Sequence, residues 1–257
     1  SGLAGAARWD AANAVWGYLG GSVDTDANTV TVPDVTAFSP WVLLAAPPPL
    51  APANLAGARA GSDLQLDWSP VVQDLLGSAV APDHYVVYRR AGEPHFYPTP
   101  ADAIAAPTTP AFTDPGVLDD PAHEYTYIVS AVDALGVESA LSNRVGVFSF
   151  GLVPAAAAGA RAYTLIAVNL EVPGVVDADT LAAYAGPGTY MVLRHGAATQ
   201  AIEWRLPGLA GTNFLVKVGD TVYLYLDDSA PDVLSLVGRV PAIGEVTVRV
   251  ASPAPPP

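Results

Sequence analysis

Few residues in this sequence have the type and spacing that catalysis or metal binding needs. The chain has four histidines and no cysteine, which excludes disulfides, thiol catalysis and cysteine-ligated metals. His84, His95, His123 and His195 lie far apart, and none has a second histidine two or four residues away, as many metal sites do. We therefore expect these histidines to be surface or turn residues.

Catalytic motifs are absent from the sequence as well. It contains neither the G-x-S-x-G motif of serine hydrolases nor the glycine-rich motifs that bind phosphate groups. A carboxylate pair for glycoside hydrolysis is defined by a separation in space, which a sequence does not give. The glutamates lie in predicted strands or turns with no shared set of loops around them, so we expect that the chain is not an enzyme.

One acidic stretch imitates a cation site. Asp24, Asp26 and Asn28 alternate with other residues, as oxygen ligands do at the start of a calcium loop. Thr29 stands where such a loop has its glycine, and Val35 stands where it has its last acid. Because Asp and Asn also favour turns, we expect a turn and no cofactor, with calcium at Asp24, Asp26 and Asn28 as the alternative.

The tryptophans are either core residues or a surface for a partner. Core packing explains Trp68 best, and it also suits Trp41 and Trp204. Trp9 and Trp16 flank a predicted turn, which makes them the better candidates for an exposed pair. Phe38 and Trp41 belong to the same small block at the start of the chain. The interaction candidates are therefore Trp9, Trp16, Phe38 and Trp41.

Composition predicts a folded protein rich in turns. The 257 residues are 51% hydrophobic and 14% charged, with 23 glycines and 25 prolines spread between short apolar runs. The formal net charge is −14, which would repel nucleic acid. No run of 18 apolar residues predicts insertion into a membrane. The chain starts at Ser1 without a signal peptide, so we interpret it as a processed or excised segment of an exported protein.

Two segments rich in proline and alanine divide the chain into three β-rich blocks. They are AAPPPLAPA at residues 45–53 and FGLVPAAAAGA at residues 150–160, and the proline run of the first favours an extended, semi-rigid spacer. The predicted domains are residues 1–46, 47–150 and 151–257. The first is near the lower size limit for an independent core, so we expect that another segment or subunit completes it.

The second block resembles a fibronectin type III domain over residues 52–148. The strand SDLQLDWS at 62–69 places Trp68 where that family has a core tryptophan, and Tyr125 occupies the position of its tyrosine corner. The resemblance implies an antiparallel β-sandwich. We expect the face with Tyr125 and Tyr127 to point inward and the face with Thr126 and Ile128 to be half exposed. A long proline-rich insertion at 92–110 departs from the family.

The third block predicts more strands and the one helix of the chain. Asp177 caps a helix over 177–185, which Gly186 ends. Strands are predicted at 163–170, 189–194, 201–205, 213–218, 221–226, 233–237 and 245–250. The predicted fold class is therefore all-β, with tandem antiparallel β-sandwich domains and one short helix in the C-terminal domain.

A short phrase occurs near both ends of the chain. RWDAANAVW at 8–16 returns as RHGAATQAIEW at 194–204, and we expect both to be hairpins. The second hairpin and the segment up to Gly219 resemble a non-catalytic β domain of large exported bacterial surface proteins. Strands and a helix precede the second hairpin, but only seven residues precede the first. The first block therefore looks like the back half of a related domain.

A half domain exposes strand edges and an apolar face. The chain is then a fragment of a longer polypeptide, or the half folds onto its neighbours, or another copy covers it. We expect a non-catalytic structural subunit of an extracellular bacterial filament, fibre or surface layer, assembled through β-domain contacts. The alternative is an accessory carbohydrate- or surface-binding module of a larger secreted hydrolase or adhesin. Expected partners are copies of itself or the rest of a longer chain, with glycans in the alternative, and the expected location is extracellular or the cell surface.

Overall fold

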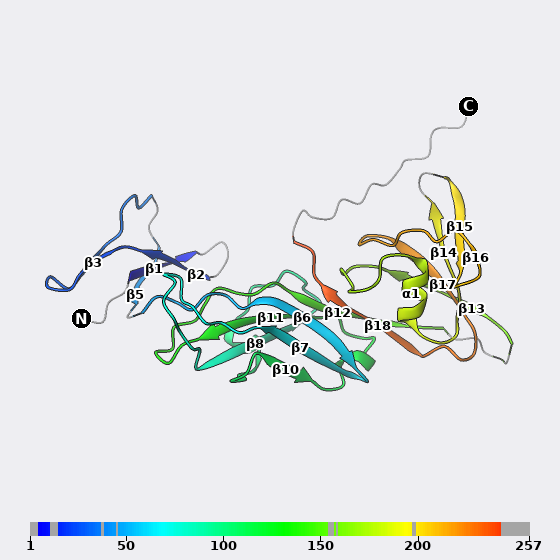
Figure 1. Cartoon of the computed structure of the whole chain (residues 1–257), viewed down its shortest axis with the longest axis horizontal. Coiled ribbons are helices and arrows are strands. Elements are labelled where there is room, and N and C mark those ends of the chain that lie inside the picture. Colours follow the sequence, from blue (N-terminus) through cyan, green and yellow to red (C-terminus); the bar gives the residue numbers. More distant parts are fainter. Residues whose placement is uncertain are drawn as a thin grey trace, which may run out of the picture. The chain divides into compact units, whose positions relative to one another are not determined.

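The computed structural model describes residues 5–10, 15–36, 39–44, 46–153, 157, 159–196 and 199–242, with Val15, Trp16 and Asp119 described by their backbone. These residues form antiparallel sheets and a short α-helix (Figure 1), which confirms the predicted fold class. Contacts group the chain into two compact units. One unit comprises residues 1–56, 65–113 and 127–144, and the other comprises residues 57–64, 114–126 and 145–257. The three predicted domain ranges stay predictions.

The first block contains two small sheets. Strands β1 (Gly5–Asp10), β2 (Val15–Gly20) and β5 (Trp41–Leu44) form a sheet in the order β2-β1-β5. Strands β3 (Ser22–Asp24) and β4 (Thr29–Thr31) form a separate hairpin. The pairing of β1 with β2 confirms the first of the two predicted hairpins. Its turn, at residues 11–14, lies outside the described residues.

The middle of the chain has a fibronectin type III-like fold. Its strands are β6 (Ala53–Ala60), β7 (Asp63–Ser69), β8 (His84–Ala91), β9 (Ala103–Ala105), β10 (Ala111–Asp114), β11 (Tyr125–Val132) and β12 (Val145–Gly151). Short 3-10 turns lie at Pro100–Asp102 and Val117–Asp119. One sheet has the order β10-β7-β6, and the other has the order β18-β12-β11-β8-β9. This is the two-sheet sandwich that the resemblance implied.

Trp68 lies in the core of this sandwich, as predicted. It is buried on β7, and its ring meets that of Tyr85 edge to face at 5.2 Å. The hydroxyl of Tyr85 in turn accepts a hydrogen bond from the backbone N–H of Val71 at 3.1 Å. The alternation of buried and exposed residues along Asp63–Ser69 follows the two-residue period of a strand with one covered face.

The prediction that one face of β11 is half exposed is wrong. Thr126, Ile128 and Ser130 are buried like the opposite face. The insertion at residues 92–110 provides the reason at Ile128, because its Phe96 is 0% exposed and packs with Tyr88 and Ile128. The insertion therefore adds a second small core to the sheet, a role that its proline content did not indicate.

The start of β11 differs in detail from the expected tyrosine corner. The Tyr125 hydroxyl donates to the carboxylate of Asp120, five residues upstream, at 3.1 Å. The corner of the family uses a backbone acceptor at a similar distance along the chain. His123 bonds the same carboxylate at 2.7 Å and stacks on the Tyr125 ring, so it is a turn residue as predicted.

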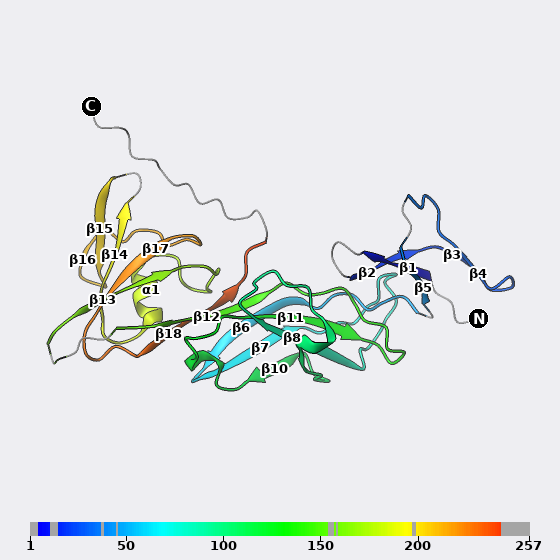
Figure 2. The same cartoon turned by 180° about the vertical axis from the view of Figure 1, so that it is seen from behind.

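The third block forms a five-stranded sheet with a helix on one face (Figures 1 and 2). Its strands are β13 (Ala162–Ala167), β14 (Thr189–Gly196), β15 (Ala201–Leu206), β16 (Ala210–Gly211) and β17 (Thr221–Leu226), in the order β13-β17-β14-β15-β16. Helix α1 (Ala178–Ala185) packs against β14 and β15. The strand predicted at 213–218 is wrong, since this stretch is a loop with a single bridge from Leu215 to Asp177. Residues 245–250 lie outside the described residues.

Strand β18 (Val233–Arg239) follows the third sheet in the sequence but pairs with β12 over seven residues. Side chains of both strands enter one core with α1 and the inner face of the third sheet. Ser149 of β12 and Ser235 of β18 are buried and hydrogen-bond each other at 2.7 Å. This strand therefore ties the third block to the last strand of the sandwich. No helix in the described part of the chain is long and apolar enough to cross a membrane.

Candidate interaction surfaces

The two predicted hairpins have the same register. In the first, Asp10 pairs with Val15 and encloses residues 11–14. In the second, Gly196 pairs with Ala201 and encloses residues 197–200. Arg8 and Arg194 therefore occupy equivalent positions, as the repeated phrase suggested. The tryptophans do not, because Trp16 corresponds to Ile202, and Tyr18 corresponds to Trp204.

The equivalence extends to a third strand. β1 pairs on its other side with β5, and β14 pairs on its other side with β17. Ala6 lies opposite Leu43, and its counterpart Val192 lies opposite Leu224. Leu43 and Leu224 are thus equivalent positions on equivalent strands. We call the sheet β2-β1-β5 the open sheet and the sheet of the third block the covered sheet.

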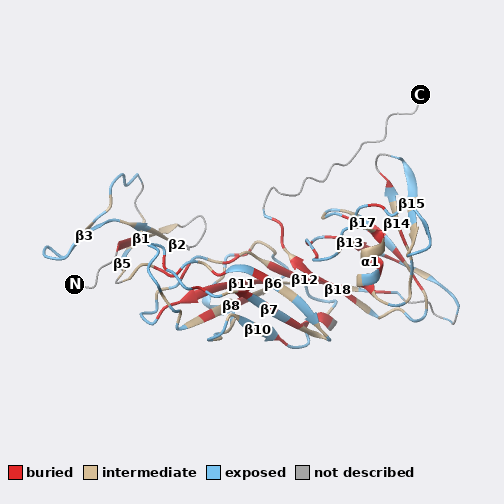
Figure 3. Cartoon of the chain, in the orientation of Figure 1, coloured by how far each residue is buried: buried red, intermediate tan, exposed pale blue. Residues whose placement is uncertain are grey.

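Burial differs sharply between the two sheets (Figure 3). Leu224 is 0% exposed, whereas Leu43 is 53% exposed. Among the described residues of 5–44, those classed as buried are Gly5, Ala6 and Ala7. The inner face of the covered sheet, by contrast, belongs to a core of nineteen buried residues that includes residues of α1, β12 and β18. The open sheet has no such cover from the described part of the chain.

The predicted interaction residues divide between the two faces of the open sheet. Trp9 lies on one face, and in the register of β1 with β2 its backbone partner is Trp16. Trp41 lies opposite Arg8 and belongs to the other face, with Leu43. Trp9 and Trp41 are half-buried. The sheet is thus apolar on both sides, although the partner role of these residues stays a prediction. Phe38 lies outside the described residues.

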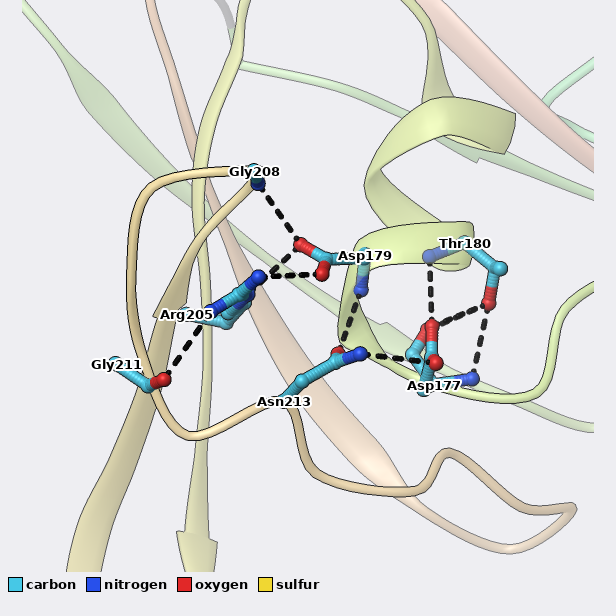
Figure 4. A network of polar contacts seen from close by, with 7 residues as sticks. All are labelled: Asp177, Asp179, Thr180, Arg205, Gly208, Gly211 and Asn213. Atoms are coloured by element: carbon cyan, nitrogen blue, oxygen red, sulfur yellow. Dashed lines mark hydrogen bonds and ion pairs between the residues drawn. The ribbon is translucent and has the colours of Figure 1, made fainter.

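Helix α1 is what covers the covered sheet, and a polar network holds its first turn (Figure 4). The carboxylate of Asp177 accepts from the backbone N–H of Thr180 at 2.8 Å, so Asp177 is the predicted cap. Asn213 donates from its side chain to Asp177 at 2.9 Å and accepts from the N–H of Asp179 at 3.0 Å. The hydrogen bond from Thr180 lowers the pKa of Asp177.

An arginine joins the same turn to the edge of the sheet. Arg205 on β15 donates two hydrogen bonds to Asp179, at 2.8 and 2.6 Å, and a third to the carbonyl of Gly211 (Figure 4). These bonds lower the pKa of Asp179. In the open sheet the equivalent position is Gly20, which lies opposite Ala6 as Arg205 lies opposite Val192. The open sheet therefore lacks the residue that anchors a helix in its counterpart.

The outer face of the covered sheet carries a surface that the sequence analysis missed. Its rings and aliphatic side chains come from β13, β17, β14 and β15 and alternate with buried residues. Tyr163 is 55% exposed and Ile202 is 59% exposed. We call this surface the tyrosine face. It comprises Tyr163, Leu165, Tyr190, Ile202, Trp204, Tyr223 and Tyr225. Trp204 is 41% exposed, so the core position predicted for it is wrong.

The rings of the tyrosine face pack against one another. Tyr163 stacks on Tyr225 with centroids 4.3 Å apart and meets Tyr223 edge to face at 6.5 Å. The guanidinium of Arg161 lies 3.6 Å from the ring centroid of Tyr190. The sequence signal for this surface is the row of rings along Tyr163–Ile166 and Tyr223–Leu226, where both faces of each strand carry large side chains. It predicts strands that are covered on both sides, yet one side is exposed here.

The acidic stretch at residues 24–28 forms the turn of the β3–β4 hairpin. The Asp24 carboxylate accepts from the backbone N–H groups of Asp26 and Ala27, at 3.0 and 2.9 Å. Asn28 has a φ of 53°, the left-handed conformation that Asn tolerates in turns. Among the described residues, no three His, Asp or Glu side chains gather into a potential metal site. Calcium at Asp24, Asp26 and Asn28 stays untested.

Comparisons with known proteins found similarity to solved structures. No family model and no curated protein matches the sequence. An Fn3-like protein from Clostridium thermocellum is 29% identical, with 37% of this chain and 88% of that chain covered and a TM-score of 0.26. The third fibronectin III domain of the human KIAA0343 protein is 19% identical, with coverages of 43% and 90% and a TM-score of 0.30. The FN1–FN3 domains of chicken CNTN1 are 11% identical, with coverages of 91% and 90% and a TM-score of 0.31.

The sheet β10-β7-β6 and the strands β12-β11-β8-β9 of the second sheet together form the sandwich. The middle of the chain is therefore a β-sandwich module with a fibronectin type III-like fold.

Proposed function

We propose that this chain is a non-catalytic structural subunit or segment of an extracellular bacterial filament, fibre or surface layer, and that it assembles through contacts of its β domains. The observation that carries the proposal is the open sheet. Leu43 is 53% exposed, whereas its counterpart Leu224 is fully buried. Exposed apolar sheets with free edges pair with other chains unless something covers them.

Charge and composition are compatible with this role. A net charge of −14 keeps copies apart in solution except where an uncharged surface meets a partner. β5 carries no charged residue, and neither does β2. Contact at the open sheet therefore brings no like charges of these strands together.

The test is self-association of the full chain with a matched pair of variants. Sedimentation velocity and electron microscopy of the wild type should show assemblies that grow with concentration. Leu43→Lys places a charge in the open sheet and should weaken association at least about tenfold, which is ~1.4 kcal/mol. Leu209→Lys makes the same change at an exposed turn residue and should leave association unchanged. Dispersed monomers of the wild type at high concentration would refute the proposal.

The tyrosine face favours a second function. Exposed rings of tyrosine and tryptophan pack against the C–H faces of sugars, and this face offers several in one surface. The chain would then be an accessory carbohydrate- or surface-binding module of a larger secreted hydrolase or adhesin. Pull-down on insoluble glycans tests this, with Tyr163→Ala on the tyrosine face and Trp16→Ala on the open sheet. Binding that both variants retain would remove these surfaces as the glycan site.

A further inference from the structure

The backbone of β5 has one side without a partner in the described part of the chain. The N–H of Trp9 donates to the carbonyl of Pro40 at 2.8 Å, next to the register in which Arg8 lies opposite Trp41. Hydrogen-bonded and non-hydrogen-bonded pairs alternate along an antiparallel ladder. The backbone groups of Val42 therefore point to β1, and those of Trp41 and Leu43 point to the open edge.

This edge is short but lacks the charges, prolines and bulges that protect many edge strands. β5 consists of Trp41, Val42, Leu43 and Leu44, without a charge, a proline or a bulge in its pairing with β1. Val42 and Leu43 are both exposed. An uncharged, apolar edge of this kind is a template for an added strand.

The covered sheet shows what completes the equivalent edge. β17, the counterpart of β5, pairs on its far side with β13 over six residues, from Ala162–Leu226 to Ala167–Thr221. Inward side chains of β13, such as Ile166, join the core with Leu224. Among the residues that the structure describes, the open sheet has no strand at the place of β13.

The end of the chain carries a segment with the pattern of such a strand. Residues 245–250 read EVTVRV, in which three valines alternate with Glu245, Thr247 and Arg249. This alternation and the β-branched residues favour a strand with one covered face. The segment has one acidic and one basic residue, so its charges balance. Prolines follow from Pro253 onward and limit the length of any strand.

We propose that residues 245–250 of one copy add to the open edge of β5 in a second copy, with the three valines beside Trp41 and Leu43. This inference rests on the proposed function, because it names the contact through which copies assemble. In this contact, each chain would supply its donor segment to one neighbour and its β5 edge to another. Such a head-to-tail contact does not close by itself and propagates into a fibre.

A second copy is favoured over the chain's own tail by the sequence between the two segments. The donor follows the acceptor by the whole sandwich and the covered sheet, and the run of prolines at 47–49 comes directly after β5. Backbone bonds hold this run, from Leu50 N–H to Gln73 O at 2.9 Å and from Leu75 N–H to Pro48 O at 3.0 Å. The spacer after β5 is thus held along residues 73–75 and is not a free linker.

Two full-chain variants separate donor from acceptor. The donor variant carries Thr247→Pro and Val248→Pro. Adjacent amides of a strand point to opposite sides, so this double variant loses the amide that faces the partner strand. In Leu43→Pro, the amide at the open edge is lost, whereas the bonds of Val42 to β1 remain. Leu43→Val keeps the amide and is the control. Each proline variant alone should be monomeric by sedimentation velocity, and an equimolar mixture of the two should form a one-to-one dimer and nothing larger.

A labelled peptide of residues 243–257 makes the test independent of folding of the acceptor variant. Fluorescence anisotropy should show that it binds the donor variant, and binding to Leu43→Pro should be at least about tenfold weaker. Assembly of the donor variant like the wild type would overturn the inference but leave the proposed function standing. The wild type could also be monomeric and fail to bind the peptide while the donor variant binds it. That result would show that the tail occupies the edge of its own chain, which also overturns the inference.

Discussion

The open sheet and the covered sheet are built on the same three-stranded plan and differ in what lies against them. Both have a hairpin of equal length, an arginine at the same register position and a third strand on the far side of the first. The covered sheet also has β13 at one edge and α1 on its inner face. Identical positions are therefore buried in one sheet and exposed in the other, which shows that the strand pattern alone does not create a core.

Anchoring explains why the helix belongs to one sheet. Arg205 and Asn213 bond the first turn of α1 through Asp179 and Asp177. In the open sheet, the position of Arg205 is Gly20, and no residues before Gly5 are described. The same three-stranded pairing thus occurs in both sheets, but the contacts that hold a helix on the sheet are described in the covered sheet alone.

The largest expected effect is at the buried member of the equivalent pair. Leu224→Ala removes a fully buried side chain from the core under α1 and should lower the unfolding free energy by about 2–5 kcal/mol. Urea denaturation followed by circular dichroism measures it. A loss below about 1 kcal/mol would mean that the covered sheet is packed as loosely as the open one.

A smaller loss is expected where β18 meets the third block. An added Cβ at Gly238 would collide with the backbone carbonyl of Glu171, which Arg239 bonds as part of a bridge. Gly238→Ala should therefore destabilise the protein by about 1–3 kcal/mol, since neither backbone can yield freely. Thermal unfolding is the measurement, and Gly151→Ala is the control, because an added Cβ there meets no atom.

The helix cap should contribute about 1 kcal/mol. Asp177→Ala removes the acceptor for the N–H of Thr180, whereas Asp177→Asn keeps one. Hydrogen bonding lowers the pKa of Asp177 in the folded state, so its stabilisation is complete above the unfolded pKa of about 3.9 and is lost as the pH falls through the folded value. Unfolding free energies at pH 7 and at pH 3 test this. The difference in unfolding free energy between the wild type and Asp177→Asn should shrink from pH 7 to pH 3. A difference that grows as the pH falls would contradict this prediction.

The smallest effect is at the exposed member of the pair. Leu43→Ala should change the unfolding free energy of the dilute chain by less than about 0.5 kcal/mol, because the side chain is largely in solvent already. The same urea titration used for Leu224→Ala measures it. A loss comparable to that of Leu224→Ala would show that the open sheet is covered in the single chain.

The sequence predicted the parts of this architecture that depend on local pattern. The helix and its cap at Asp177, the core position of Trp68 and both hairpins follow from spacing and residue type. The strand predicted at 213–218 failed because Asn213 and Leu215 bond to α1 instead of a neighbouring strand. Local alternation does not reveal such a partner.

The surfaces were harder to predict because exposure depends on distant segments. The covered second face of β11 depends on Phe96, and the pairing of β18 with β12 joins residues far apart in the sequence. The tyrosine face was missed because its strands look buried on both sides. The open sheet, by contrast, was predicted from length, since a block of that size has too little apolar material for a core.

Amide hydrogen exchange tests most directly the claim that the open sheet lacks cover in the single chain. At a dilution where the chain is monomeric, the amides of Trp41 and Leu43 should exchange with an opening free energy near zero, whereas those of Tyr223 and Leu224 should require nearly global unfolding. Protection of Trp41 and Leu43 equal to that of β17 under these conditions would contradict the account.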